Sequence, residues 1–328
     1  PWVIEADTKA KRARKLAEDI GEAIVGRRLA KIALDENSPI LGGYFGDSEG
    51  WKVFEQIGIG AVAKEGAWQE ALTLVEQEMR RAAQFGFTQA EVDEQLAIRR
   101  TALKTAVAGV TTRRSDGLAD ALVEAADGDF VVARPETSQA LFDAAAPALN
   151  ADAVTAAFRK RMQGFSAPLV RVTAKTPIEG GTGAILAALN ASQKVAVAAP
   201  AAATSAKFAY DDFGTPGKIV SDTRIADLGI RRIRFANNVM LNIKTTDFQK
   251  ERVYLAVRVD GGNLLATRDD PTKVALMGSF VVGGLEAHSF DDLRTIFAGK
   301  TVGSNFGSDT DAFGGAALTS PEDFRLQA

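Results

Sequence analysis

The chain has 328 residues, a length that favours two domains, because single cores rarely grow beyond about 250 residues. Apolar residues make up 46% and charged residues 25% of it, and no apolar run reaches the roughly 18 residues that span a membrane. A net charge of −3 argues against a nucleic-acid-binding surface, and the absence of cysteine excludes disulfides, thiolate metal sites and cysteine nucleophiles. We therefore expect no nucleic acid and no membrane as partners.

Both ends of the sequence have the features of an internal fragment. The first five residues contain no initiator Met and no signal-peptide pattern. Near the other end, Ser320 and Pro321 predict the N-cap and first position of a helix that would have only one or two turns. We expect a piece of a longer chain.

The first half predicts a sheet layer covered by helices. Apolar residues recur at helical spacing over 7–34, and alternation after a turn over 40–62 predicts a two-stranded hairpin. Thr88 and Glu91 form a capping box that starts a helix. Further helices are predicted at 68–85, 115–126, 137–146 and 150–162. Residues 168–174 predict a short strand.

The second half predicts strands before helices. Strands are predicted at 218–221, 230–235, 239–244, 252–259, 301–306 and 312–318, and helices at 273–282 and 289–297. Asn237 and Asn238 predict a two-residue turn. An Ala/Pro-rich stretch precedes these strands and lacks the side-chain bulk to build a core. We therefore predict a helix-rich domain at 1–193, a linker at 194–216 and an incomplete second domain at 217–328.

In this order the elements resemble the pitrilysin/insulinase family of zinc metallopeptidases. The resemblance rests on residues 20–29, on a helix end followed by Gly86 and a capped helix over 78–93, and on 234–244, 253–262 and 283–285. It implies an α+β fold made of two related sheet-plus-helix domains of the pitrilysin/mitochondrial-processing-peptidase type. The first would close the N-terminal half of the family's four-domain chain, and the second would be a truncated, non-catalytic first domain of the C-terminal half.

Active members of this family hold zinc with two histidines in H-x-x-E-H and use the intervening glutamate as a base. The chain has a single histidine, His288, and the motif's histidine positions would fall on Gly283 and Ala287. We therefore predict no catalytic, cofactor-binding or metal-binding residue in this chain, and the resemblance places the zinc in a domain upstream of Pro1. His288 is interpreted as a loop residue beside Ser289, the N-cap of the next helix.

Two glycine patterns have a functional and a structural interpretation. Residues 58–63 fit the dinucleotide pattern G-x-G-x-x-A, but Arg80 and Arg81 occupy the region where an acid should bind ribose. Gly180–Ala184 has the glycines of an anion cradle without the lysine of a P-loop. The preferred interpretations are a hairpin strand for residues 58–63 and a flexible helix start for Gly180–Ala184.

Charged and aromatic groups are interpreted in the same way. The arginines of 231–234 flank Ile233, a pattern typical of a solvated strand face around one buried residue. The aspartate pairs at 211–212, 269–270 and 291–292 favour helix and turn capping over catalysis. The aromatic residues Tyr44, Phe45, Trp51 and Phe54 favour core packing, with the border of a substrate chamber as the alternative.

The resemblance implies a non-catalytic section of a zinc-dependent metalloendopeptidase that forms chamber wall and holds peptide or unfolded polypeptide. Its partners would be the remaining domains of the same chain, with a homo- or heterodimer left open, and the periplasm follows by analogy with family members. One alternative is a scaffold or partner subunit whose parent has lost zinc binding. Another is an unrelated α+β binding module, whose two domains need not share a fold.

Overall fold

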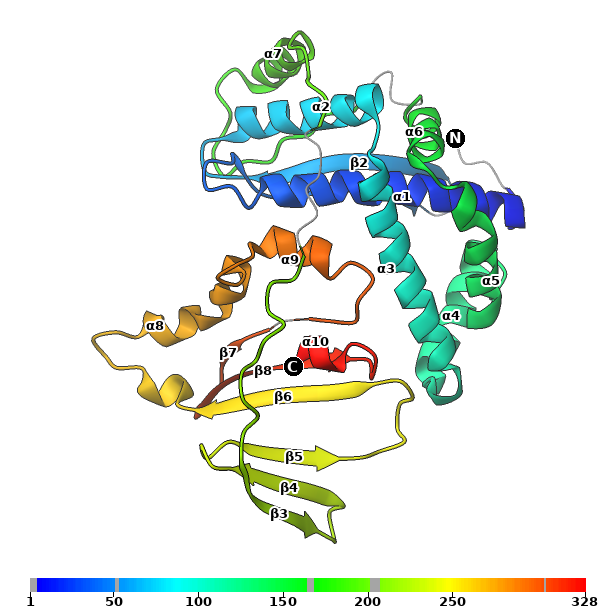
Figure 1. The fold of residues 1–328 in the computed structure, drawn as a ribbon. Coiled ribbons are helices and arrows are strands. Elements are labelled where there is room, and N and C mark those ends of the chain that lie inside the picture. Colours follow the sequence, from blue (N-terminus) through cyan, green and yellow to red (C-terminus); the bar gives the residue numbers. More distant parts are fainter. Residues whose placement is uncertain (1–4, 51–52, 164–167, 201–206, 304) are drawn as a thin grey trace. The chain divides into compact units, whose positions relative to one another are not determined.

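The computed structural model describes residues 5–50, 53–163, 168–200, 207–303 and 305–328 (Figure 1). Its fold is α+β, as expected from the sequence. The chain divides into two compact units. The first comprises Pro1–Lys104 and Leu118–Thr204, and the second comprises Thr105–Gly117 and Ser205–Ala328.

The first unit combines one antiparallel hairpin with several helices. Its elements are α1 (Lys9–Ile32), β1 (Ile40–Gly50), β2 (Phe54–Ala63), α2 (Trp68–Phe85), α3 (Gln89–Ala108), α4 (Ser115–Gly128), α5 (Pro135–Ala145), α6 (Ala151–Met162) and α7 (Gly181–Gln193), of which α3 and α4 extend into residues 105–117. Strands β1 and β2 pair from Ile40 opposite Ala63 to Gly50 opposite Phe54. The predicted hairpin and the predicted helices of this half are confirmed.

Local capping explains where these helices start. Thr8 Oγ1 accepts a hydrogen bond of 3.1 Å from the Lys11 N–H at the start of α1. The capping box before α3 is confirmed, because the Glu91 N–H donates to Thr88 Oγ1 at 3.3 Å and the Thr88 N–H donates to the Glu91 carboxylate at 2.8 Å. Thr88 and Glu91, the two residues of the capping box, are three positions apart, so the pattern can be recognised from the sequence alone.

The core of the first unit lies between the helices and one face of the hairpin. Its most buried side chains come from α1, α3 and α6: Ile20, Ile24, Val25, Leu29, Val92, Val154 and Phe158, each at most 1% exposed. The hairpin contributes Phe45, Ile57 and Ile59 to the edge of this cluster. The unit is therefore built of two layers, a helical layer and a hairpin.

Gly86 fixes the turn that brings α2 and α3 against α6. Its φ is +72° and its ψ is −147°, a region that residues with a Cβ avoid. A Cβ at this position would lie 2.4 Å from Thr155 Oγ1 of α6. That hydroxyl oxygen accepts a hydrogen bond of 3.1 Å from the Phe87 N–H. The close approach needs glycine, because no other residue has both the backbone freedom and the space.

The second unit contains two three-stranded antiparallel sheets. Its elements are β3 (Ile219–Ile225), β4 (Ile230–Phe235), β5 (Met240–Lys244), β6 (Val253–Asp260), α8 (Thr272–Ala275), α9 (Phe290–Ile296), β7 (Gly307–Ser308), β8 (Ala312–Thr319) and α10 (Phe324–Gln327), with 3-10 helices η3 (Gly262–Leu265) and η4 (Leu276–Gly283). The strand orders are β3-β4-β5 and β6-β8-β7.

Two predicted strands are wrong. Residues 168–174 are irregular, and Leu169 is 98% exposed. Alternation alone does not make a strand, because a strand needs a hydrogen-bonded neighbour. Residues 301–306 contain no strand in their described part, since the backbone of Thr301 is engaged by the side chains of Asp323 and Thr319 at 2.7 and 2.6 Å.

Three further boundaries differ from the sequence predictions. The helix predicted at 273–282 is the short α8 followed by η4, a run that contains the poor helix former Gly278. The loop between β4 and β5 has four residues, 236–239, with Asn238 at φ +67°. The helix predicted to start after Ser320 begins at Phe324, because Ser320 Oγ caps a preceding turn through the Asp323 N–H at 3.1 Å.

None of the helices in the described part of the chain is long and apolar enough to cross a membrane.

Gly86→Ala is expected to lower the free energy of unfolding by about 2–4 kcal/mol, because it combines a forbidden backbone conformation with a clash against Thr155. Gly26→Ala is the matched control. Gly26 lies inside α1 with no atom within 4 Å of an added Cβ, so its substitution should raise stability by about 0.5–1 kcal/mol. Urea unfolding followed by circular dichroism measures both. Equal stability of Gly86→Ala and the wild type would contradict this account of the turn.

Candidate functional site

The two faces of the β1–β2 hairpin differ in chemistry. Phe45, Ile57 and Ile59 point inward and pack against the helical core. On the opposite face, Gly42 pairs with Val62, Tyr44 with Gly60 and Gly46 with Gly58. Cross-strand partners share a face of an antiparallel sheet. We call this second set, together with the pair of Ser48 and Gln56, the outer face.

The outer face is open and consists largely of backbone. A Cβ added at Gly42 or Gly46 would meet nothing within 4 Å. The Tyr44 ring lies over Gly60, where an added Cβ would be 2.6 Å from its hydroxyl oxygen. Exposed fractions are 64% for Tyr44 and 60% for Val62. The result is a flat surface with one aromatic ring and one β-branched side chain available for contact.

Core packing, the preferred interpretation of the aromatic cluster, is wrong for two of its members. Phe45 does pack in the core, with its ring centroid 5.6 Å from that of Phe158. Tyr44 is on the outer face, and Phe54, at the end of the hairpin, is 47% exposed. Strand alternation places Tyr44 and Phe45 on opposite faces, so neighbours in sequence cannot share one core. Trp51 lies outside the described residues.

Each strand of the hairpin has one edge without a strand partner among the described residues, since β1 and β2 pair only with each other. Such edges present backbone N–H and C=O groups that can pair with another extended chain. Together with the outer face, they form the surface of the first unit best suited to holding a polypeptide.

A charge cluster ties this hairpin to the helices beneath it. Arg161 of α6 donates to Asp47 of β1 at 2.8 Å and also to Glu55 of β2. Lys15 of α1 donates to the same Asp47 at 2.6 Å. Because the three ion pairs join β1, β2, α1 and α6, they fix the position of the hairpin on the core.

Glu22 is the least satisfied member of this cluster. Its Oε1 lies 3.8 Å from Arg161 Nε, and neither atom has a hydrogen-bond partner. Burial, followed by the nearby charge of Asp47, raises the pKa of Glu22 to about 7. Burial also disfavours the charge on Asp47, but the hydrogen bonds and positive charges of Lys15 and Arg161 together outweigh it and lower the pKa of that carboxyl. The pKa values of two carboxyls in the same cluster are thus shifted in opposite directions.

The donor set of the described chain does not fit zinc. Among the described residues, no group of three or more His, Cys, Asp and Glu side chains could hold a metal ion. His288 is 6% exposed, and its Nε2 accepts a hydrogen bond of 2.9 Å from the Ala209 N–H. As expected, it lies outside regular helix and strand beside Ser289, the N-cap of α9.

The other sequence patterns take the structural roles preferred for them. Gly58 and Gly60 lie inside β2, and Gly180, at φ +76°, is the N-cap of α7. Ile233 is buried at 5% exposure within β4, between exposed arginines. Asp292 completes the capping box of α9. Of these residues, Gly58 and Gly60 belong to the outer face of the hairpin.

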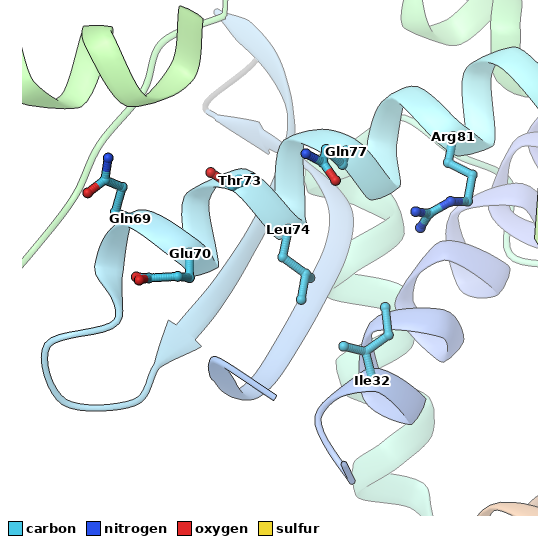
Figure 2. A pocket seen from close by; sticks show the side chains of 7 residues that line it. All are labelled: Ile32, Gln69, Glu70, Thr73, Leu74, Gln77 and Arg81. Atoms are coloured by element: carbon cyan, nitrogen blue, oxygen red, sulfur yellow. The ribbon is translucent and has the colours of Figure 1, made fainter. Parts of the chain in front are cut away.

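A hollow on α2 was not foreseen from the sequence. Figure 2 shows its lining side chains, which are Ile32, Gln69, Glu70, Thr73, Leu74, Gln77 and Arg81. Its volume is about 660 Å³ and it is open to solvent. Arg81 is engaged elsewhere, donating to the Ala198 carbonyl at 3.0 Å.

No protein-family model and no curated protein sequence matches the chain. The periplasmic protease PqqL from Escherichia coli matches it structurally over 99% of this chain and 36% of its own, at 15% identity and a TM-score of 0.51. The ferredoxin protease FusC, solved as a mutant in complex with Arabidopsis ferredoxin, matches over 96% and 36%, at 14% identity and a TM-score of 0.51. An insulinase-family protease from Yersinia pestis matches over 56% and 40%, at 15% identity and a TM-score of 0.45.

These structural neighbours are insulinase-family, pitrilysin-like proteases. The chain shares the mixed helix-and-sheet fold of their domains. It spans 36% of the length of PqqL and of FusC, so it corresponds to part of such a protein.

Glu22→Gln should change stability in a pH-dependent way. The pKa of Glu22 is about 7 in the folded state against 4.5 for an unperturbed glutamate, so the folded state binds more protons than the unfolded state between these pH values. The stability that protonated Glu22 contributes is therefore present below pH 4.5 and lost as the pH rises through 7. Glutamine cannot ionise, and the variant should exceed the wild type at pH 8 by about 1–3 kcal/mol.

At pH 4 the same variant should match the wild type, because both side chains are then neutral. Urea unfolding at the two pH values measures the difference. Glu36→Gln is the control, since Glu36 is exposed in the loop before β1 and its substitution should leave the pH profile unchanged. A Glu22→Gln variant that is less stable than the wild type at pH 8 would show that the ionised Glu22–Arg161 pair stabilises the fold.

Proposed function

We propose that the chain is a non-catalytic section of a zinc-dependent metalloendopeptidase of the pitrilysin/insulinase type. In this role it forms part of the wall of the substrate chamber and holds an extended polypeptide against the β1–β2 hairpin. The observation that carries the proposal is the open outer face of the hairpin, with unpaired strand edges, within a fold shared with proteases.

The hairpin suits a polypeptide for physical reasons. Hydrogen bonds from a strand edge use the backbone of the bound chain, so they accept many sequences. Glycine at Gly42, Gly46 and Gly58 lets a bound backbone approach closely, and Tyr44 offers an aromatic ring for its side chains. A protein that degrades varied polypeptides needs this kind of tolerant contact.

The neighbours support a polypeptide as the ligand, since both are proteases and FusC was solved with a protein, ferredoxin. Zinc and the hydrolytic step would come from a part of the parent outside these residues, because the donor set of this chain does not fit the metal. The other domains of the parent are the proposed partners, with a dimer as a further arrangement. The periplasm is proposed by likeness to PqqL.

Binding of an unfolded polypeptide tests the proposal. We expect the chain to bind a fluorescein-labelled, disordered polypeptide of about 30 residues, with fluorescence anisotropy as the measurement. The double variant Gly46→Val/Gly58→Val fills one cross-strand pair of the outer face with side chains that favour strands, so it should fold. Its affinity should fall by about tenfold or more, which corresponds to about 1.4 kcal/mol.

Thr223→Val is the matched control. It places a valine at an exposed position of β3 in the second unit and should leave the affinity unchanged. Undiminished binding by the double variant, or no binding by the wild type at about millimolar concentration, would remove the hairpin from the binding surface.

A further inference from the structure

Residues Phe208–Tyr210, at the end of the connection between the two units, are docked within the second unit by a pair of hydrogen bonds. The Ala209 N–H donates to His288 Nε2 at 2.9 Å. The Ala287 N–H donates to the Tyr210 hydroxyl oxygen at 2.8 Å. The segment is thereby held to the turn that precedes α9, on both sides of the imidazole.

Aromatic rings enclose the same imidazole. The Phe208 ring stacks on His288 with centroids 5.7 Å apart and an interplanar angle of 14°. The Tyr210 ring meets it edge-on at 5.9 Å and 77°. Phe208 also contacts Phe297, at the end of α9, at 5.3 Å. His288 is consequently 6% exposed although it lies in a turn.

The turn that carries His288 is rigidly built. Leu285 and His288 exchange two backbone hydrogen bonds of 2.8 and 2.9 Å. Gly284 has φ +79°, and a Cβ there would lie 2.4 Å from the His288 carbonyl oxygen. Ser289 then starts α9 with a capping box. His288 therefore has little freedom to move away from the docked segment.

The hydrogen bond from Ala209 exists only in one protonation state. Nε2 accepts a hydrogen bond when the imidazole is neutral with its proton on Nδ1, whereas both nitrogens of the imidazolium are donors. In the charged state two N–H groups would face each other across 2.9 Å. Imidazole is the side chain that changes charge between about pH 5 and 8.

The neighbouring ionisable groups do not replace this switch. Asp292 of α9 is electrostatically coupled to His288, but hydrogen bonds from Ser289 lower the pKa of Asp292, which keeps it ionised across that range. Tyr210 of the docked segment is a phenol that stays neutral below about pH 9. Glu286 lies in the turn itself and is exposed.

We propose that His288 is a pH-operated latch, whose neutral imidazole docks residues 208–210 and whose protonation releases them. Release would undock residues 208–210 from the turn before α9 within the second unit. The latch does not depend on the proposed peptide-holding role.

Nuclear magnetic resonance on the full chain tests the latch through one signal. Tyr210 is the only tyrosine that follows an alanine, since Tyr44 follows Gly43 and Tyr254 follows Val253. Labelling with carbonyl-¹³C alanine and ¹⁵N tyrosine therefore selects the Tyr210 amide. We expect this signal to shift to its random-coil position as the pH is lowered, while the amides of Tyr44 and Tyr254 report an intact fold.

Two variants separate hydrogen bonding from stacking. His288→Gln supplies an amide oxygen that accepts a hydrogen bond and does not titrate, so Tyr210 should stay docked at both pH values. His288→Phe keeps an aromatic ring but offers no acceptor, so the Tyr210 signal should be displaced towards the free position at both. A Tyr210 signal that does not move while the wild-type imidazole titrates, or one that moves equally in His288→Gln, would overturn the proposal.

Discussion

The first unit depends on burying one face of a hairpin while the other is left as backbone. Phe45, Ile57 and Ile59 join the helical core, and their burial contributes roughly 1–2 kcal/mol each. Glycines on the opposite face remove the side chains that would otherwise need a second helical layer. A two-stranded hairpin alone is marginal in water, so this one persists because its inner face is anchored. The same anchoring makes the outer face available to a ligand.

The charge cluster under the hairpin fixes the orientation of the hairpin on the helices, at some cost in stability. Four carboxylates, those of Glu18, Glu22, Asp47 and Glu55, lie within ion-pair reach of Arg161. Glu18 is also paired with Arg14, whereas Glu22 makes a long contact with Arg161, and burial followed by the charge of Asp47 raises the pKa of Glu22. Buried ion pairs of this kind stabilise less than apolar packing would, but they fix which elements meet. Here they specify how β1 and β2 lie across α1 and α6.

Sequence reasoning succeeded where the decisive contacts are local. Helix α2 has the predicted bounds of 68 and 85. These bounds were predictable because the helical spacing of apolar residues, the glycine that ends the helix and the capping box of the next helix are all local features of the sequence. It failed where a partner is distant. Residues 168–174 alternate like a strand yet have no neighbour to pair with, and Arg161 meets Asp47 across 114 residues of chain. The hairpin was predictable from its alternation, but the openness of its outer face was not, since that depends on which helices cover which side.

Two of the buried ionisable groups, Glu22 and His288, belong to different units and respond to protonation in opposite directions. Protonation of Glu22 removes an uncompensated charge from beneath the hairpin, so mild acid favours the folded first unit. Protonation of His288 removes an acceptor from the end of the connecting segment, so the same acid loosens that segment. The two groups would therefore make the two units respond to acid in opposite senses.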